Sequence, residues 1–94
     1  MQLYAIRRRN GWKDGDALRA AAEISTAEGE KMPDDIRWIR SYVLAEDDGT
    51  LGTVCIYQAS SPEKIREHAA RVGMPADEIS VAADTVIVRP DPSA

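Results

Sequence analysis

Two apolar segments separated by a single turn constrain this chain more than any other feature. They span about residues 36–45 and 51–59 and are rich in the β-branched and aromatic residues that favour strands. Asp48-Gly49 between them is a strong turn signal, so the pair predicts a β-hairpin. Apolar residues fall on both faces of this hairpin, whereas an antiparallel hairpin usually leaves one face to water. Something must therefore cover the second face.

The aromatic and thiol side chains of the hairpin are the candidate ligand-binding groups. Strict alternation places Ile36, Trp38, Tyr42 and Leu44 on one face of the first strand, and Ile39, Val43 and Ala45 on the other. In the second strand, Val54 and Ile56 share one side, and Cys55 and Tyr57 share the other. Depending on register, we expect the uncovered face to hold some combination of Trp38, Tyr42, Cys55 and Tyr57, which we predict to bind a ligand or fill a dimer core.

Two helices are predicted on either side of the hairpin. Asp14 or Asp16 can cap a first helix, which starts near Ala17 and presents Ala17, Ala21 and Ile24 to the core before Gly29 ends it. The second helix has clearer limits, with Ser61 as N-cap and Pro62 at its first position. It buries Ile65, Ala69 and Val72 and ends at Gly73, where a left-handed residue is favoured.

The order of the elements predicts the fold. A first strand over 2–9 and a last strand over about 79–89 complete the order β-α-β-β-α-β. With right-handed crossovers this order gives a ferredoxin-like α+β domain, an antiparallel sheet with both helices on one face. We expect one domain over residues 1–90 and a flexible tail over 91–94. Two bare sheet faces packed together, as in a dimeric α+β barrel, would cover the apolar face, so we predict a homodimer.

The composition and charge of the chain argue against several functional classes. Twelve basic against 16 acidic residues give a net charge of −4, which argues against a nucleic-acid binder. RNA-recognition domains share this topology but need aromatic residues in the 51–58 strand at positions where this chain has none, and the chain contains no Phe. The single cysteine excludes an internal disulfide, and no segment resembles a signal peptide or a membrane span. We therefore expect a cytoplasmic protein with no membrane or nucleic-acid partner.

Few side chains are candidates for metal binding or catalysis. His68 is either a half-exposed surface residue or a metal ligand or acid–base group. Cys55 is either a small buried hydrophobe or a soft metal ligand or thiolate in the dimer cavity. These two residues are our predicted metal ligands. No catalytic motif is present, and the basic run Arg7-Arg8-Arg9 is interpreted as a solvated strand end.

Four segments carry a resemblance to a known family: 38–43 with W-x-x-S-Y-V, 53–59 with C-x-Y-x-A, 62–69, and 73–79 with G-x-P-x-D-x-I. The chain resembles a short bacterial ferredoxin-like family of unknown function, one branch of which is described as nickel-binding. The resemblance covers about half of the chain. It implies a ferredoxin-like fold, a dimer and nickel as a possible cofactor.

The leading prediction is a cytoplasmic, homodimeric, non-catalytic binding protein for a metal ion, with nickel as one possibility, or for a small ligand. Two alternatives remain open. One is a small cofactor-independent oxygenase- or isomerase-like enzyme that works in a barrel cavity, which rests on fold analogy. The other is a structural interaction module.

Overall fold

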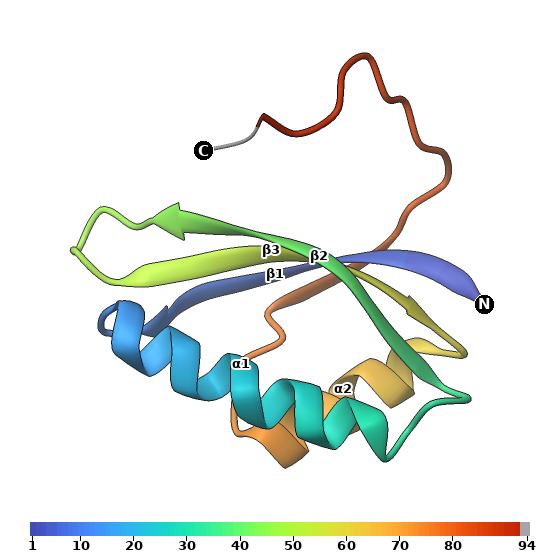
Figure 1. Ribbon diagram of the computed structural model, residues 1–94, viewed down its shortest axis with the longest axis horizontal. Helices are drawn as coiled ribbons and strands as arrows, with labels where there is room; N and C mark the ends of the chain where they lie inside the picture. The colour runs from blue at the N-terminus through green and yellow to red at the C-terminus, as the bar shows by residue number, and fades with distance from the viewer. Residues whose placement is uncertain (93–94) are drawn as a thin grey trace.

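The computed structural model describes residues 1–92 of the protein. Its elements are β1 (Gln2–Trp12), α1 (Gly15–Glu30), β2 (Ile36–Ala45), β3 (Leu51–Ala59), α2 (Pro62–Val72) and β4 (Glu78–Val81). The strands form one antiparallel sheet in the order β2-β3-β1-β4. Both helices lie on the same face of this sheet (Figure 1). This arrangement confirms the predicted ferredoxin-like α+β fold.

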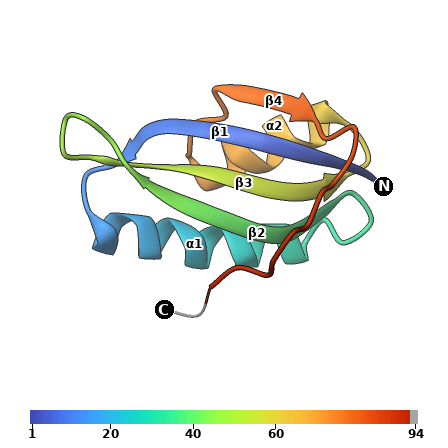
Figure 2. The same ribbon diagram turned by 90° about the horizontal axis from the view of Figure 1, so that it is seen from above.

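The helix limits follow the local signals. The Asp14 carboxylate accepts a 2.9 Å hydrogen bond from Ala17 N and begins α1, and the Ser61 hydroxyl caps α2 through Lys64 N. Gly73 ends α2 with a φ of 81°, a left-handed conformation that glycine adopts without strain. Seen from above, α1 lies beneath the β2 edge, and α2 lies toward β1 and β4 (Figure 2). No described helix has the length and apolar content needed to cross a membrane.

The face that α1 presents to the sheet differs from the prediction. Ile24, expected in the core, is 48% exposed, while the neighbouring Ser25 is 4% exposed. The contacting face instead follows Leu18, Ala21, Ala22 and Ser25. The apolar periodicity gave the wrong buried face because α1 is rich in alanine, and the position of its one isoleucine decided the prediction. A small-residue face leaves room between the helix and the sheet.

A β-bulge in β2 changes which side chains share a face. The β2–β3 register shifts between Trp38 and Arg40, so strict alternation fails there. Before the bulge, Trp38 pairs with Tyr57 on the helix side; after it, Ser41 pairs with Cys55 on the same side. Tyr42 pairs with Val54 on the open side. Some combination of Trp38, Tyr42, Cys55 and Tyr57 was expected on the uncovered face, and only Tyr42 lies there; the other three face the helices.

The core lies between the sheet and the helices. Its buried members come mainly from the central strands β1 and β3. They are Tyr4, Ile6, Met32, Ile36, Cys55, Tyr57, Ala59 and Ile65. The edge strand β2 adds little, because most of its residues are exposed.

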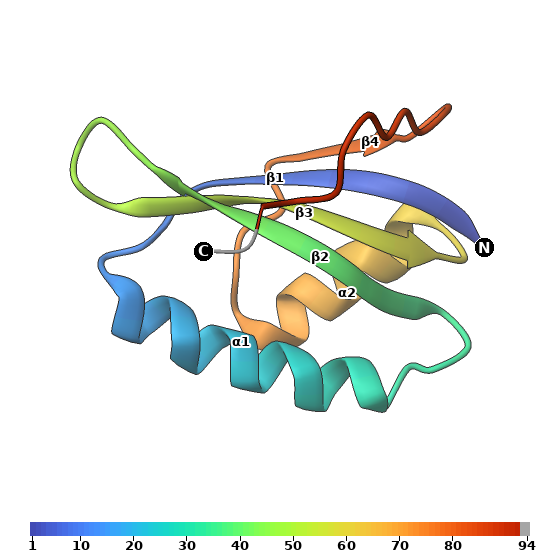
Figure 3. The same ribbon diagram turned by 45° about the horizontal axis from the view of Figure 1, so that its top comes forward.

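The C-terminal segment 82–92 departs from the prediction of a long last strand. β4 ends at Val81, and the chain then arches over the open face of the sheet (Figures 1 and 3). It returns toward β2, where the Asp91 carboxylate accepts hydrogen bonds of 2.9 Å from Arg40 and 2.8 Å from Tyr42. Side-chain hydrogen bonds join this segment to β2, and it does not extend the sheet as a strand. The expected flexibility of residues 91–94 stays a prediction, and residues 93–94 lie outside the described part of the chain.

Candidate functional site

A cavity of about 360 Å³ opens between α1 and the β2–β3 part of the sheet. We call it the inner cavity. From α1 it is lined by Leu18, Ala21, Ala22 and Ser25, and from β2 and β3 chiefly by Trp38, Ser41, Val43, Thr53, Cys55 and Tyr57. Ile39, Arg40, Trp12 and Met74 complete its wall, so both tryptophans of the chain border it. Its size falls at the low end of small-molecule sites, which are concave and mostly apolar with a few polar groups.

The aromatic wall of the inner cavity is held in place by the bulge. Trp38 stacks on Tyr57 with ring centroids 6.0 Å apart and an interplanar angle of 6°. The indole N–H of Trp38 donates a 2.7 Å hydrogen bond to the Ser41 hydroxyl, across the bulge on the same strand. Trp38 is nevertheless 41% exposed, so its ring forms a rim and Tyr57 forms the buried back wall.

A buried polar chain separates the inner cavity from a second one. The Tyr57 and Ser25 hydroxyls lie 3.3 Å apart, and His68 Nε2 lies 3.0 Å from the Ser25 carbonyl oxygen. Burial raises the pKa of the Tyr57 phenol and lowers the pKa of the His68 imidazole, because both charged forms lose water. His68 lines the second cavity, of about 440 Å³, with Gly29 and Ile36. His68 is 1% exposed, so it is a core residue and not the half-exposed surface residue that was one expectation.

The predicted metal ligands do not meet. Cys55 is buried, and its Sγ donates to the Thr53 hydroxyl at 3.2 Å. His68 lies beyond Tyr57 and is engaged by Ser25. Among the described residues, no group of three or more His, Cys, Asp or Glu side chains is placed to hold a metal ion. The residues that the structure describes in a single chain therefore do not fit the nickel that the resemblance implies.

Arg8 is the functional candidate that sequence reasoning missed. The interpretation of Arg7-Arg8-Arg9 as a solvated strand end is wrong for Arg8, which is 1% exposed. Its Nη1 donates a 2.6 Å hydrogen bond to the Pro75 carbonyl oxygen, and its Cζ lies 5.9 Å from the Tyr57 ring centroid. Its Nη2 is buried without a partner. Alternation contained the signal, since Tyr4, Ile6 and Arg8 fall on one face of β1.

Most of the chain matches the model of one protein family. The model of the family described as nickel responsive protein SCO4226-like matches residues 4–81. The chain belongs to this family. The match begins at the third residue of β1, spans both helices and the rest of the sheet, and ends where the chain leaves β4.

One solved structure supports the fold. The chain is similar to SCO4226 from Streptomyces coelicolor A3(2), with a TM-score of 0.68 and 19% sequence identity over 89% of this chain and 99% of that one. A comparison with curated proteins gives no match. The family confirms the resemblance drawn from the four sequence segments.

Proposed function

We propose that this protein is a small, non-catalytic binding protein that takes a small organic ligand in the inner cavity. The observation that carries the proposal is the cavity itself, whose wall holds Trp38, Cys55 and Tyr57, three of the four predicted ligand-binding residues. Its lining is mostly apolar, with Ser25, Ser41, Thr53 and Tyr57 as its hydroxyl groups. Such a lining favours binding by apolar contact, with a few polar groups for orientation.

Binding is favoured over catalysis by what the cavity wall contains. Among the described residues, no histidine or carboxylate lines it. The Cys55 thiol donates to Thr53 and has no base beside it, so nothing activates it as a nucleophile. Burial also raises the pKa of Tyr57, which keeps the phenol protonated at neutral pH. The enzyme alternative therefore lacks a general base at this site.

Ligand binding is testable with benzyl alcohol, a small neutral probe with an aromatic body. Emission from Trp12 and Trp38, which both border the cavity, should change saturably with the probe, and calorimetry should give one site per chain. Iodoacetamide should alkylate Cys55, the only thiol, more slowly when the probe is bound. An unsaturable emission change with an unaltered alkylation rate would contradict the proposal.

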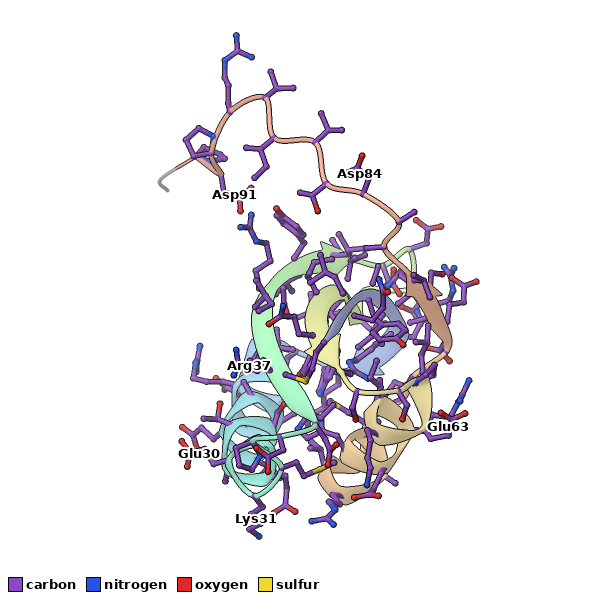
Figure 4. All side chains as sticks on the ribbon, turned by 90° about the vertical axis from the view of Figure 1, so that its right-hand side faces the viewer. Glu30, Lys31, Arg37, Glu63, Asp84 and Asp91 are labelled. Carbon is purple, nitrogen blue, oxygen red and sulfur yellow. The ribbon has the colours of Figure 1, made fainter. Side chains whose placement is uncertain are left out.

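The same proposal includes a homodimer in the cytoplasm. Val86, Ile87 and Val88 on the C-terminal segment are 84%, 72% and 80% exposed, and Tyr42 on the open face is 43% exposed. Figure 4 shows this segment arched away from the sheet between Asp84 and Asp91. Three consecutive β-branched residues in water are costly, and their β propensity suits pairing with a strand of a second copy. The second copy is the occupant that we propose for the open face.

Sedimentation velocity tests the dimer. The double variant Val86→Asp with Val88→Asp should shift the protein to a monomer, because it places charges in the proposed contact. Ile24→Asp is the matched control, since Ile24 is 48% exposed on α1, on the other side of the sheet, and should leave the dimer intact. A wild-type protein that stays monomeric at high concentration would refute the dimer.

Nickel is a second candidate ligand, favoured by the family description. Because one described chain offers no three-ligand group, nickel would need donors from both chains of a dimer. Calorimetric titration of metal-free protein with nickel, copper and zinc tests this. One nickel per dimer, lost in the monomeric variant, would support a shared site, and the absence of heat above buffer would remove the candidate. His68→Gln and Cys55→Ser should leave such a site unaffected, since both side chains are engaged inside the fold.

A further inference from the structure

The three consecutive arginines of β1 have different partners. Arg7 forms an ion pair of 2.8 Å with Glu46, and Arg9 forms one of 3.0 Å with Glu78. Arg8 is the most buried of the three, yet among the described residues its side chain donates one hydrogen bond, from Nη1 to the Pro75 carbonyl oxygen. A buried guanidinium that keeps its charge is costly unless an anion compensates it. The fold compensates the two outer charges and leaves the inner one unpaired.

The unpaired nitrogen of Arg8 lies behind the wall of the inner cavity. Thr53, in the wall, is the register partner of Arg8 on β3. Tyr57, also in the wall, lies under the guanidinium, and Met74 precedes the proline whose carbonyl holds Nη1. Met74 is the flexible member of this wall, because methionine is unbranched and adapts to its neighbours. Arg8 does not itself line the cavity, so a ligand there reaches Nη2 only if this wall rearranges, and Met74 is the wall residue best able to move.

We propose that the inner cavity takes a small monocarboxylate, with its apolar body between α1 and the Trp38–Tyr57 wall and its carboxylate on Nη2 of Arg8. This inference rests on the proposed binding function and names its ligand class. A single negative charge matches Arg8, whose Nη2 is buried without a partner among the described residues, whereas Arg40 in the cavity wall is already paired with Asp91. The mostly apolar lining excludes a larger polyanion. Because Nη1 already donates to the Pro75 carbonyl oxygen, the carboxylate accepts one charge-assisted hydrogen bond, from Nη2.

Phenylacetate and its neutral isostere phenylacetamide separate this inference from the proposed function. Both are titrated at pH 7 into the wild-type protein, with tryptophan emission as the readout. We expect the acid to bind at least about tenfold more tightly than the amide, since hydrogen bonds to charged groups are among the stronger ones. Equal affinities would overturn the role of Arg8 and leave the cavity as a binding site. Failure of both probes and of benzyl alcohol would overturn both proposals.

Variants of the arginine run assign the preference to one side chain. Arg8→Gln should lower the affinity for phenylacetate to that for phenylacetamide, and Arg8→Lys should restore part of the difference. Arg9→Gln is the matched control, because Arg9 is an exposed neighbour, and should keep the full preference. An acid preference that survives in a folded Arg8→Gln protein would refute the inference.

Should Arg8→Gln not fold, side-chain NMR of the wild-type protein keeps the question answerable. The guanidinium signals of Arg8 should shift with phenylacetate and not with phenylacetamide. Unchanged Arg8 signals with bound phenylacetate would refute the inference.

Discussion

Ala21 on α1 offers a way to fill the inner cavity from the helix side. Ala21→Leu adds three carbons, and each buried CH₂ stabilises by about 0.8 kcal/mol, which sets an upper value of about 2.4 kcal/mol. Residual structure in the unfolded chain and the lower helix propensity of leucine reduce this to about 1.5 kcal/mol. For a domain of this size, that gain raises Tm by about 6–12 °C.

Urea unfolding gives the free-energy change, and the benzyl alcohol titration of the same variant gives the loss of binding. Ala21→Leu should be more stable than the wild type and should no longer bind the probe. Ala20→Leu is the matched control, because Ala20 is exposed on the same helix and carries the same propensity change. Its stability should stay within about 0.5 kcal/mol of the wild type, with probe binding intact.

Two results would contradict the reasoning about the cavity. A loss of about 1–3 kcal/mol in Ala21→Leu would show overpacking, which means that the space is already filled in the folded protein. A stable Ala21→Leu that still binds the probe would place the ligand elsewhere on the molecule.

Three further predictions concern the surroundings of the site. Burial lowers the pKa of His68 in the folded protein. As pH falls below about 6.5, the unfolded chain therefore binds the proton more readily than the folded one, and the free energy of unfolding decreases by at most about 1.4 kcal/mol per pH unit. Urea unfolding between pH 7.5 and 5 should show this slope, and a His68→Gln protein with the same slope would refute it. Gly52→Ala should cost about 1–3 kcal/mol in urea unfolding, because its Cβ would lie 2.6 Å from both the Arg8 carbonyl oxygen and Glu46 Oε2; Gly15→Ala, whose Cβ meets nothing within 4 Å, is the control, and equal effects would contradict the argument. Tyr57→Phe should cost about 0.5–1.5 kcal/mol by removing the hydroxyl bond to Ser25, and the loss should largely vanish in a Ser25→Ala background.

The elements of the fold were predictable because each has a local cause. Asp14, Ser61 and Gly73 act as the caps that their residue types favour, and the alternation in β3 predicted its two faces. The antiparallel sheet with two helices on one face then followed from the order of the elements. These signals act over a few residues, so one sequence is enough to read them.

The candidate site was harder to predict because it depends on contacts between distant residues. The bulge after Trp38 moves that ring to the helix side, and a bulge has no reliable sequence signal. The burial of Ser25 and His68 depends on α1 packing beside α2, where the Ser25 hydroxyl meets Tyr57 and the Ser25 backbone carbonyl meets His68. Arg8 is the exception, because the alternation of β1 predicts that its side chain points inward. The prediction failed because Arg8 lies between Arg7 and Arg9, and the three arginines were interpreted together as one solvated run.

A crystal structure of the protein soaked with phenylacetate tests the central claim most directly. The account predicts the ring between Ala21 of α1 and the Trp38–Tyr57 wall, with the carboxylate at Nη2 of Arg8 and Met74 rotated away. A cavity filled by protein side chains, or phenylacetate bound only on the open sheet face, would contradict it.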